Sequence, residues 1–213
     1  MSPIRRTGPT KNQPENSGYI TGVVIGLVTQ NKDDEGLCRV QVSYPWHEKP
    51  QESYWARLAM PMAGNERGLV LIPEVGDEVL VAFERGDLRF PYLLGGLWNG
   101  KDRPPYSNDD GKNDKRGIRS RKKHYLLFDD GDVGVVELAH EKGRKITFDD
   151  EGFSVHDENG NAVKVDSSSG AMTLEATGQF RIKAASISIE ATGTIEVKAG
   201  ATLTILGSLV KIN

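Results

Sequence analysis

The histidines and the single cysteine are the residues of this chain best suited to catalysis or transition-metal binding. The histidines are His47, His124, His140 and His156, and they lie far apart in the sequence. The chain contains neither a His-Glu-x-x-His pattern nor a Gly-x-Ser-x-Gly sequence. Cys38 is the only cysteine, which excludes an intramolecular disulfide and a multi-cysteine zinc site. We therefore predict no catalytic site, no metal site and no cofactor.

Acidic residues gather in sequences typical of turns. Asp129-Asp130-Gly131 and Asp149-Asp150-Glu151 each follow a short apolar stretch. Such carboxylates can bind a cation or form the acid pair of a glycosidase. In turns, however, they more often accept hydrogen bonds from the backbone, and we interpret them in this way. A wall-degrading enzyme is kept as an alternative function.

The composition indicates a soluble chain with two different parts. The 213 residues include 27 Lys and Arg against 30 Asp and Glu, and the mean hydropathy is −0.46. Residues 1–14 are polar and lack the apolar core of a secretory signal, so we expect synthesis in the cytoplasm without a signal peptide. All ten prolines lie before residue 106. The segment after them, residues 101–123, is rich in Asp, Asn, Gly and basic residues, which is typical of a linker or neck.

Short β-branched stretches separated by turn sequences fill residues 19–98. Five or six short strands in about 80 residues favour a small closed barrel, because closure removes exposed strand edges. An OB-type barrel fits this size. Cys38 lies in an alternating stretch and is interpreted as a small core residue. Trp46 and Trp55 are likewise interpreted as core residues of the barrel.

A repeat with a period of seven to eight residues begins at Met172. Within each unit apolar and polar residues alternate, so one face of a short strand is buried. One unit forms only one strand and one corner, whereas a single-chain β-helix needs about three strands per turn. Three intertwined chains would complete a triangular β-prism. Its predicted trimer core consists of Leu174, Ile182, Ile189, Val197, Ile205 and Ile212.

The expected fold is therefore all-β, with an N-terminal OB-fold barrel followed by an intertwined trimeric β-helix. The expected segments are an N-terminal arm over residues 1–17, the barrel over 18–100, the linker over 101–123 and the spike over 124–213. An ordinary antiparallel sheet of short strands is the alternative for the repeat.

Several stretches resemble the central spike proteins of contractile injection systems, the phage baseplate assembly protein V and VgrG-like proteins. The resemblance rests on Pro73–Phe83 (PEVGDEVLVAF) and Pro91–Asn99 (PYLLGGLWN) in the barrel. It continues in Gly117–Arg121, Phe128–Asp130 and Ile146–Asp150, which resemble the neck of VgrG proteins. It implies a non-enzymatic homotrimer at the centre of a baseplate, in a phage tail or another contractile injection particle, that pierces the target envelope mechanically.

The resemblance also implies partners. Few residues precede the barrel, so we expect the hub to be a separate protein. The linker is too short to hold the lysozyme domain of some phage spikes. A small PAAR-type tip protein is expected to dock on Leu209, Val210, Lys211, Ile212 and Asn213. Effector cargo and transient contact with the target membrane are further expectations.

A nucleic-acid-binding OB protein is the main alternative. That function needs a basic and aromatic binding face. The strands show no regular interleaving of these residue types, and the isoelectric point is about 5.9. We therefore expect no nucleic-acid partner.

Overall fold

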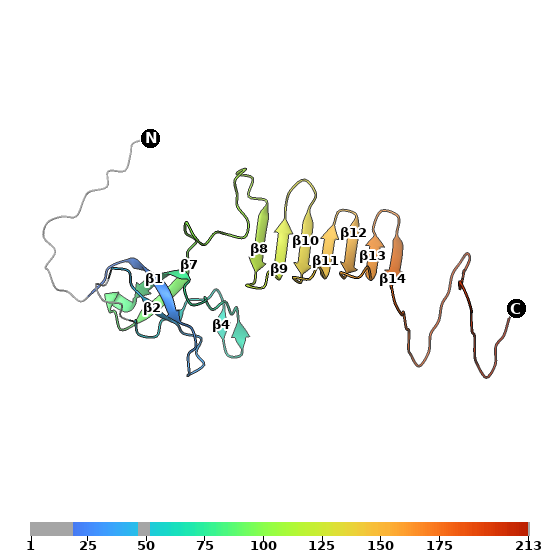
Figure 1. Ribbon diagram of the computed structural model, residues 1–213, viewed down its shortest axis with the longest axis horizontal. Coiled ribbons are helices and arrows are strands. Elements are labelled where there is room, and N and C mark those ends of the chain that lie inside the picture. The colour runs from blue at the N-terminus through green and yellow to red at the C-terminus, as the bar shows by residue number, and fades with distance from the viewer. Residues whose placement is uncertain (1–18, 47–51, 213) are drawn as a thin grey trace. The chain divides into compact units, whose positions relative to one another are not determined.

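The computed structural model describes residues 19–46 and 52–212. The chain divides into two compact units, residues 1–107 and 108–213, which Figure 1 shows. The predicted arm, His47 and Asn213 lie outside the described residues.

The first unit is built around a five-stranded sheet with the order β2-β1-β6-β7-β3. The two edge strands meet through a bridge between Val40 and Ala56, which exchange backbone hydrogen bonds of 3.1 and 2.7 Å. This bridge closes the sheet, so the predicted OB-type barrel is confirmed. The elements are β1 (Val23–Gln30), β2 (Gln41–Ser43), β3 (Arg57–Leu58), β4 (Ala63–Gly64), β5 (Arg67–Gly68), β6 (Glu78–Phe83), the 3-10 turn η1 (Glu84–Gly86) and β7 (Pro91–Gly96).

The barrel core consists mainly of aliphatic side chains. Alternate residues of β6, Val79, Val81 and Phe83, are buried, as the period of a half-buried strand requires. Gly26 allows close packing across the core, because a Cβ at this position would lie 3.2 Å from the Cβ of Val42. Hydrophobic burial thus stabilises a small, tightly packed barrel.

Two predictions about the barrel core are wrong. Cys38 is exposed and has a φ of 55°, so it lies in the loop before β2 and not in a strand. Asp33 holds this loop by accepting hydrogen bonds from Arg39 Nε at 2.8 Å and from the backbone of Leu37 at 3.2 Å. Trp46 is 48% exposed and stacks on Tyr44. Trp55 is only half-buried, because the narrow barrel is already filled by aliphatic residues.

The second unit contains a seven-stranded antiparallel sheet in which the strands follow one another in chain order (Figure 1). Short hairpin turns connect the strands. In one turn Asp149 Oδ1 accepts hydrogen bonds from the backbone of Glu151 and Gly152, both at 3.0 Å, as the turn interpretation of the acidic residues predicts. The strands are β8 (Lys115–Arg119), β9 (Tyr125–Asp129), β10 (Val135–Ala139), β11 (Lys145–Asp149), β12 (Gly152–His156), β13 (Ala162–Asp166) and β14 (Ala171–Glu175).

One strand of this sheet was not expected. β8 lies within residues 101–123, so the segment predicted as a linker contains a strand. The predicted winding of the stalk around other chains stays a prediction, and residues 125–175 pair with their own chain in antiparallel hairpins. The tight turns at the strand ends explain this, because two-stranded hairpins form locally with little loop-closure cost.

The chain changes character after β14. Residues 176–212 belong to no strand and are exposed throughout, and in Figure 1 they leave the sheet as an open trace. Bends fall at residues 177–178, 185, 192–193, 200–201 and 208, close to the predicted corners of the repeat. Within one chain these residues do not form the alternative antiparallel sheet. The intertwined β-prism stays a prediction.

Candidate assembly interface

The strand register places nearly all apolar side chains of the seven-stranded sheet on one face. Residues directly opposite one another in successive strands share a face, since side chains alternate with a period of two. Two rows of apolar residues follow from the pairing. One row is Phe128, Val136, Phe148, Phe153, Val165 and Met172, and the other is Ile118, Leu126, Leu138, Ile146, Val155, Val163 and Leu174.

These two rows, which we call the apolar face, are largely uncovered in a single chain. Phe148 is 52% exposed and Leu138 is 55% exposed. A contiguous apolar surface of this extent is unusual for a monomer and marks an interaction site. The sequence placed this region in the stalk but predicted only Leu174 among these residues as a core residue, although the alternation of the others with polar residues was visible.

The opposite, polar face is satisfied within the chain. Glu137 accepts hydrogen bonds from Tyr125 Oη at 2.6 Å and from Lys145 Nζ at 2.5 Å. Burial alone would raise the pKa of Glu137, but these donors together with Thr147 lower it below its ordinary value. The polar face therefore needs no partner, whereas the apolar face does.

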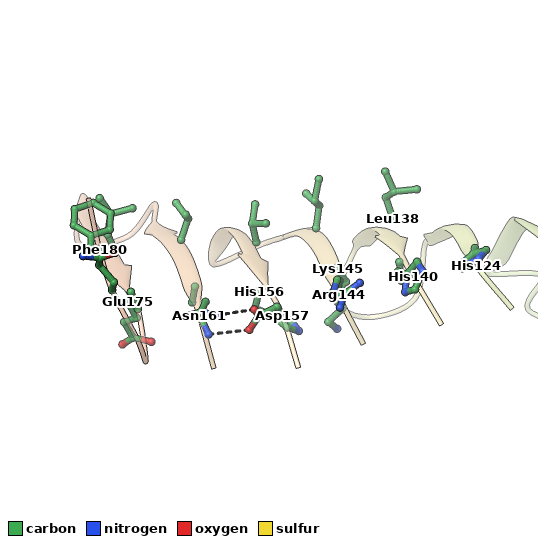
Figure 2. A pocket seen from close by; sticks show the side chains of 18 residues that line it. His124, Leu138, His140, Arg144, Lys145, His156, Asp157, Asn161, Glu175 and Phe180 are labelled. Atoms are coloured by element: carbon green, nitrogen blue, oxygen red, sulfur yellow. Dashed lines mark hydrogen bonds between the residues drawn. The ribbon is translucent and has the colours of Figure 1, made fainter. Parts of the chain in front are cut away.

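An open groove of about 800 Å³ runs along one side of the apolar face. Its floor includes Leu138, which stands out from the sheet in Figure 2, and Phe180 also lines it. The structure brings His124 and His140 together at the rim, with ring centroids 4.4 Å apart. Both Nδ1 atoms accept backbone hydrogen bonds at 3.2 Å, from Glu141 and Lys142 respectively.

The polar rim of the groove is also satisfied locally. The side-chain amide of Asn161 donates to Asp157 Oδ2 at 2.7 Å, which Figure 2 shows as a dashed line. Arg144 forms an ion pair with Glu158 at 2.6 Å. Within residues 19–46 and 52–212, no group of three or more His, Cys, Asp or Glu side chains could hold a metal ion. The groove therefore suits apolar side chains of another chain better than a polar substrate.

The predicted trimer-core residues occupy two different environments. Leu174 lies in β14 at the end of one apolar row. The other five follow in the unpaired segment, where Ile189 is 71% exposed. A single chain does not bring them together. Of the predicted tip-docking residues, Leu209, Val210, Lys211 and Ile212 are exposed, and Asn213 lies outside the described residues.

A second groove, of about 1230 Å³, lies in the barrel unit. Trp55, Arg57 and Phe90 line it, and the guanidinium of Arg57 lies over the ring of Tyr92. This mixture of arginines and aromatic rings is the kind of surface that single-stranded nucleic acid requires. The sequence did not reveal it, because the residues come from separate loops and strands.

Two of the four arginines that line this second groove, Arg39 and Arg89, are paired with acids. Arg39 binds Asp33 at 2.8 Å and Glu35 at 3.1 Å. Arg89 binds Asp87 at 2.6 Å, and this hydrogen bond lowers the pKa of Asp87 to about 2. Part of the positive charge that phosphates would require is thus neutralised, which disfavours the nucleic-acid alternative. In the described part of the chain, no helix is long and apolar enough to cross a membrane.

Comparisons with known proteins bear on the N-terminal half of the chain. Residues 24–98 match the family of type VI secretion system and phage-baseplate injector OB domains. The type VI secretion system spike protein VgrG1b of Pseudomonas aeruginosa is 33% identical over 102 residues, which are 46% of this chain and 14% of that protein. Spike protein VgrG3 of Vibrio cholerae is 31% identical over 104 residues, which are 47% of this chain and 10% of that protein.

A third relative is the actin cross-linking toxin VgrG1 of Vibrio cholerae, which is 30% identical over 103 residues. The match covers 45% of this chain but only 9% of the toxin. The chain therefore spans a small part of the length of these relatives. The predicted resemblance is nevertheless confirmed: the chain is similar to VgrG spike proteins over its N-terminal half, and residues 24–98 match the type VI secretion system and phage-baseplate injector OB domain.

Proposed function

We propose that this chain is the structural central spike of a contractile injection baseplate, in a phage tail or a secretion system, and that it acts as a homotrimer. The injector OB domain and the VgrG relatives support the type of assembly. The uncovered apolar face supports the trimer, because two further copies would cover it. No separate partner is needed for this, and symmetric self-association is the commonest way to bury such a face.

The observation that carries the proposal is the contrast between the two halves of the second unit. The two buried residues of the sheet, Ala139 and Thr147, lie on its polar side, and residues 176–212 expose an alternating pattern without a strand partner among the described residues. Exposed Ile and Val side chains are unfavourable in water, and backbone groups that leave water on assembly need hydrogen-bond partners. Three chains wound around one axis would bury these side chains and pair these backbone groups. The resulting prism would resist bending under the force of sheath contraction.

Mechanical piercing without enzymatic activity is part of the proposal. The described side chains gather into no metal cluster, and the groove on the apolar face has an apolar floor. The toxin activity named for one relative belongs to a protein of which this chain matches only 9%. Zymography against peptidoglycan should show no clearing, and cleared bands would support the wall-degrading alternative.

The partners of the proposed spike are a separate hub protein at the barrel, a PAAR-type tip protein and effector cargo. Synthesis in the cytoplasm, assembly into the particle and brief contact with the target membrane complete the proposal. The exposed residues Leu209, Val210 and Ile212 support tip docking. Replacing Leu209 and Ile212 by Asp should abolish co-purification of the tip protein, whereas Ser208→Asp should not.

The oligomeric state tests the proposal directly. Native mass measurement of the full chain should give three copies of 23.4 kDa at micromolar concentration. In addition, pull-down with the hub protein of the same gene cluster should recover the complete trimer. A stable monomer, or a trimer that binds no baseplate component, would contradict the proposed function.

A further inference from the structure

The outward charges of the repeat alternate in sign from one unit to the next. When the units are aligned on Leu174, Ile182, Ile189 and Val197, the residue that follows each is Glu175, Lys183, Glu190 and Lys198 in turn. The position before each central residue shows no such alternation, since it holds Thr173, Arg181, Ser188 and Glu196. The alternation is therefore confined to one column of the outer surface.

Threefold symmetry determines which units would become neighbours. This inference rests on the proposed trimeric spike. We take each chain to advance by one face of the prism per repeat unit. Each level of the prism then holds the same unit from all three chains. On any one face, successive units along the axis therefore come from different chains. Adjacent strands are about 4.8 Å apart. Residues seven or eight apart in the sequence thus become direct neighbours on different chains.

We propose that Glu175, Lys183, Glu190 and Lys198 form an interchain ladder of ion pairs that sets the register of the intertwined strands. Each Lys183 lies between Glu175 and Glu190 of neighbouring copies, and each Glu190 lies between Lys183 and Lys198. A slip by one further unit would place Glu175 beside Glu190 and Lys183 beside Lys198. Like charges would then oppose each other, so the alternation disfavours the shifted register as well as favouring the native one.

The position of β14 supports this arrangement. β14 is the last strand of the seven-stranded sheet, so one of its edges has no strand partner among the described residues. Glu175 is the last residue of β14 and is exposed. The unit that contains Lys183 is the next in sequence, and Lys183 has no ion-pair partner among the described residues. The free edge of β14 is thus available for the corresponding unit of another copy.

The sheet already uses the same device within one chain. Lys115 lies directly opposite Asp129 in the register of β8 and β9, and Nζ is 2.9 Å from Oδ2. Lys145 of β11 pairs across the same face with Glu137 of β10 at 2.5 Å. Opposite charges on adjacent strands therefore organise the polar face before β14, and the ladder continues this pattern between chains.

Co-expression of two differently tagged chains tests the ladder. One is the natural chain, and the other carries Glu175→Lys, Lys183→Glu, Glu190→Lys and Lys198→Glu. The inverted chain keeps every attractive pair in its own trimers, but in a mixed trimer two of the three chain-to-chain contacts oppose like charges. Random association of equal amounts gives about three quarters mixed trimers. We expect fewer than about one tenth by native mass measurement.

The matched control carries Arg181→Glu alone, whose neighbours in the stack are the uncharged residues Thr173 and Ser188. Glu196 is left unchanged, because its carboxylate lies 2.6 Å from Nζ of Lys198, a member of the ladder. This variant should mix with the natural chain at close to the random proportion. In addition, Lys183→Glu should lower the melting temperature more than Arg181→Glu in low salt. The difference in melting temperature between these two variants should become smaller in about 1 M salt, because the screening length falls to about 3 Å.

The outcomes separate this inference from the proposed function. Random mixing of the inverted chain, or its failure to trimerise alone, overturns the ladder while the natural trimer stands. A natural chain that forms no trimer overturns the proposed function itself. If the inverted chain forms trimers separate from the natural chain while the control chain mixes freely with it, the result supports both the ion-pair ladder and the proposed function.

Discussion

Leu174 of β14 lies directly opposite Val163 of β13, and it is the last predicted core residue that has a strand partner in its own chain. Even so, Leu174 is 54% exposed, because no described residue covers this end of the apolar face. The pair marks the point at which strand pairing ends among the described residues. Beyond it, the proposed trimer would supply partners for backbone and side chains.

An aspartate on the apolar face should prevent assembly. Val155 and Ser154 are adjacent in β12 and point to opposite faces. Val155→Asp would bury an unpaired carboxylate between three chains, at a cost of about 3–5 kcal/mol per site. Ser154→Asp should stay within about 0.5 kcal/mol. Sedimentation should show a dissociated Val155→Asp chain and a trimeric Ser154→Asp chain. Because Val155 is exposed in the single chain, equal behaviour of the two variants would exclude this face from the interface.

The same comparison applies to the intertwined segment. Ile189 is a predicted core residue, and its neighbour Ser188 faces outward by strand alternation. Ile189→Asp should lower the melting temperature of the trimer strongly, since three carboxylates would meet near the axis without partners. Ser188→Asp should change it by only a few degrees. Thermal unfolding monitored by circular dichroism measures the melting temperatures of both variants. A larger loss for Ser188→Asp than for Ile189→Asp would mean that the assigned inner face is wrong.

Gly152 should tolerate no side chain. Its φ is 150°, and a Cβ would lie 2.0 Å from the carbonyl oxygen of Val165 in the neighbouring strand. Gly152→Ala must therefore move β12 away from β13, and we expect a loss of about 2 kcal/mol or more. Gly134→Ala is the control, because a Cβ there meets no atom within 4 Å. Denaturant unfolding of both variants measures the difference, and comparable stability would argue against this packing.

The turn after β13 should make stability depend on acid. Asp166 Oδ1 accepts hydrogen bonds from the hydroxyl of Ser168 at 2.7 Å and from the backbone of Ser169 at 2.9 Å. The Ser168 hydroxyl is the main cause that lowers the pKa of Asp166 to about 2. The ordinary value is about 3.9. Because the folded-state pKa is the lower one, this contribution is complete above about pH 4 and is lost as the pH falls towards 2.

Asp166→Asn should therefore make the melting temperature fall less steeply between pH 4 and pH 2. This range lies between the ordinary pKa of an aspartate and the lowered pKa of Asp166 in the folded chain, which differ by about two pH units. Asp150→Asn is the control, because Asp150 accepts no hydrogen bond among the described residues. Parallel acid profiles of the natural chain and Asp166→Asn would show that the turn does not contribute.

The sequence by itself determined the all-β class and the barrel. It predicted a change of character at Met172, whereas the structure places this change after β14, at residue 176. Alternation in β6 and the clustered turn residues are local properties, and local patterns read directly as strands and turns. The period of the repeat likewise predicts which side chains share a face. The resemblance to injection spikes rested on contiguous stretches such as Pro73–Phe83, so it too was visible without coordinates.

Only the tertiary structure decided how the strands pair. The sequence could not distinguish an intrachain hairpin from an interchain winding in residues 125–175, because both bury the same alternating face. The strand register brought Phe148, Leu138 and Val155 onto one exposed surface, which the proposed trimer would cover. The positions of Cys38 and Trp46 also depended on packing, since the narrow barrel was already filled by smaller side chains and left both outside its core.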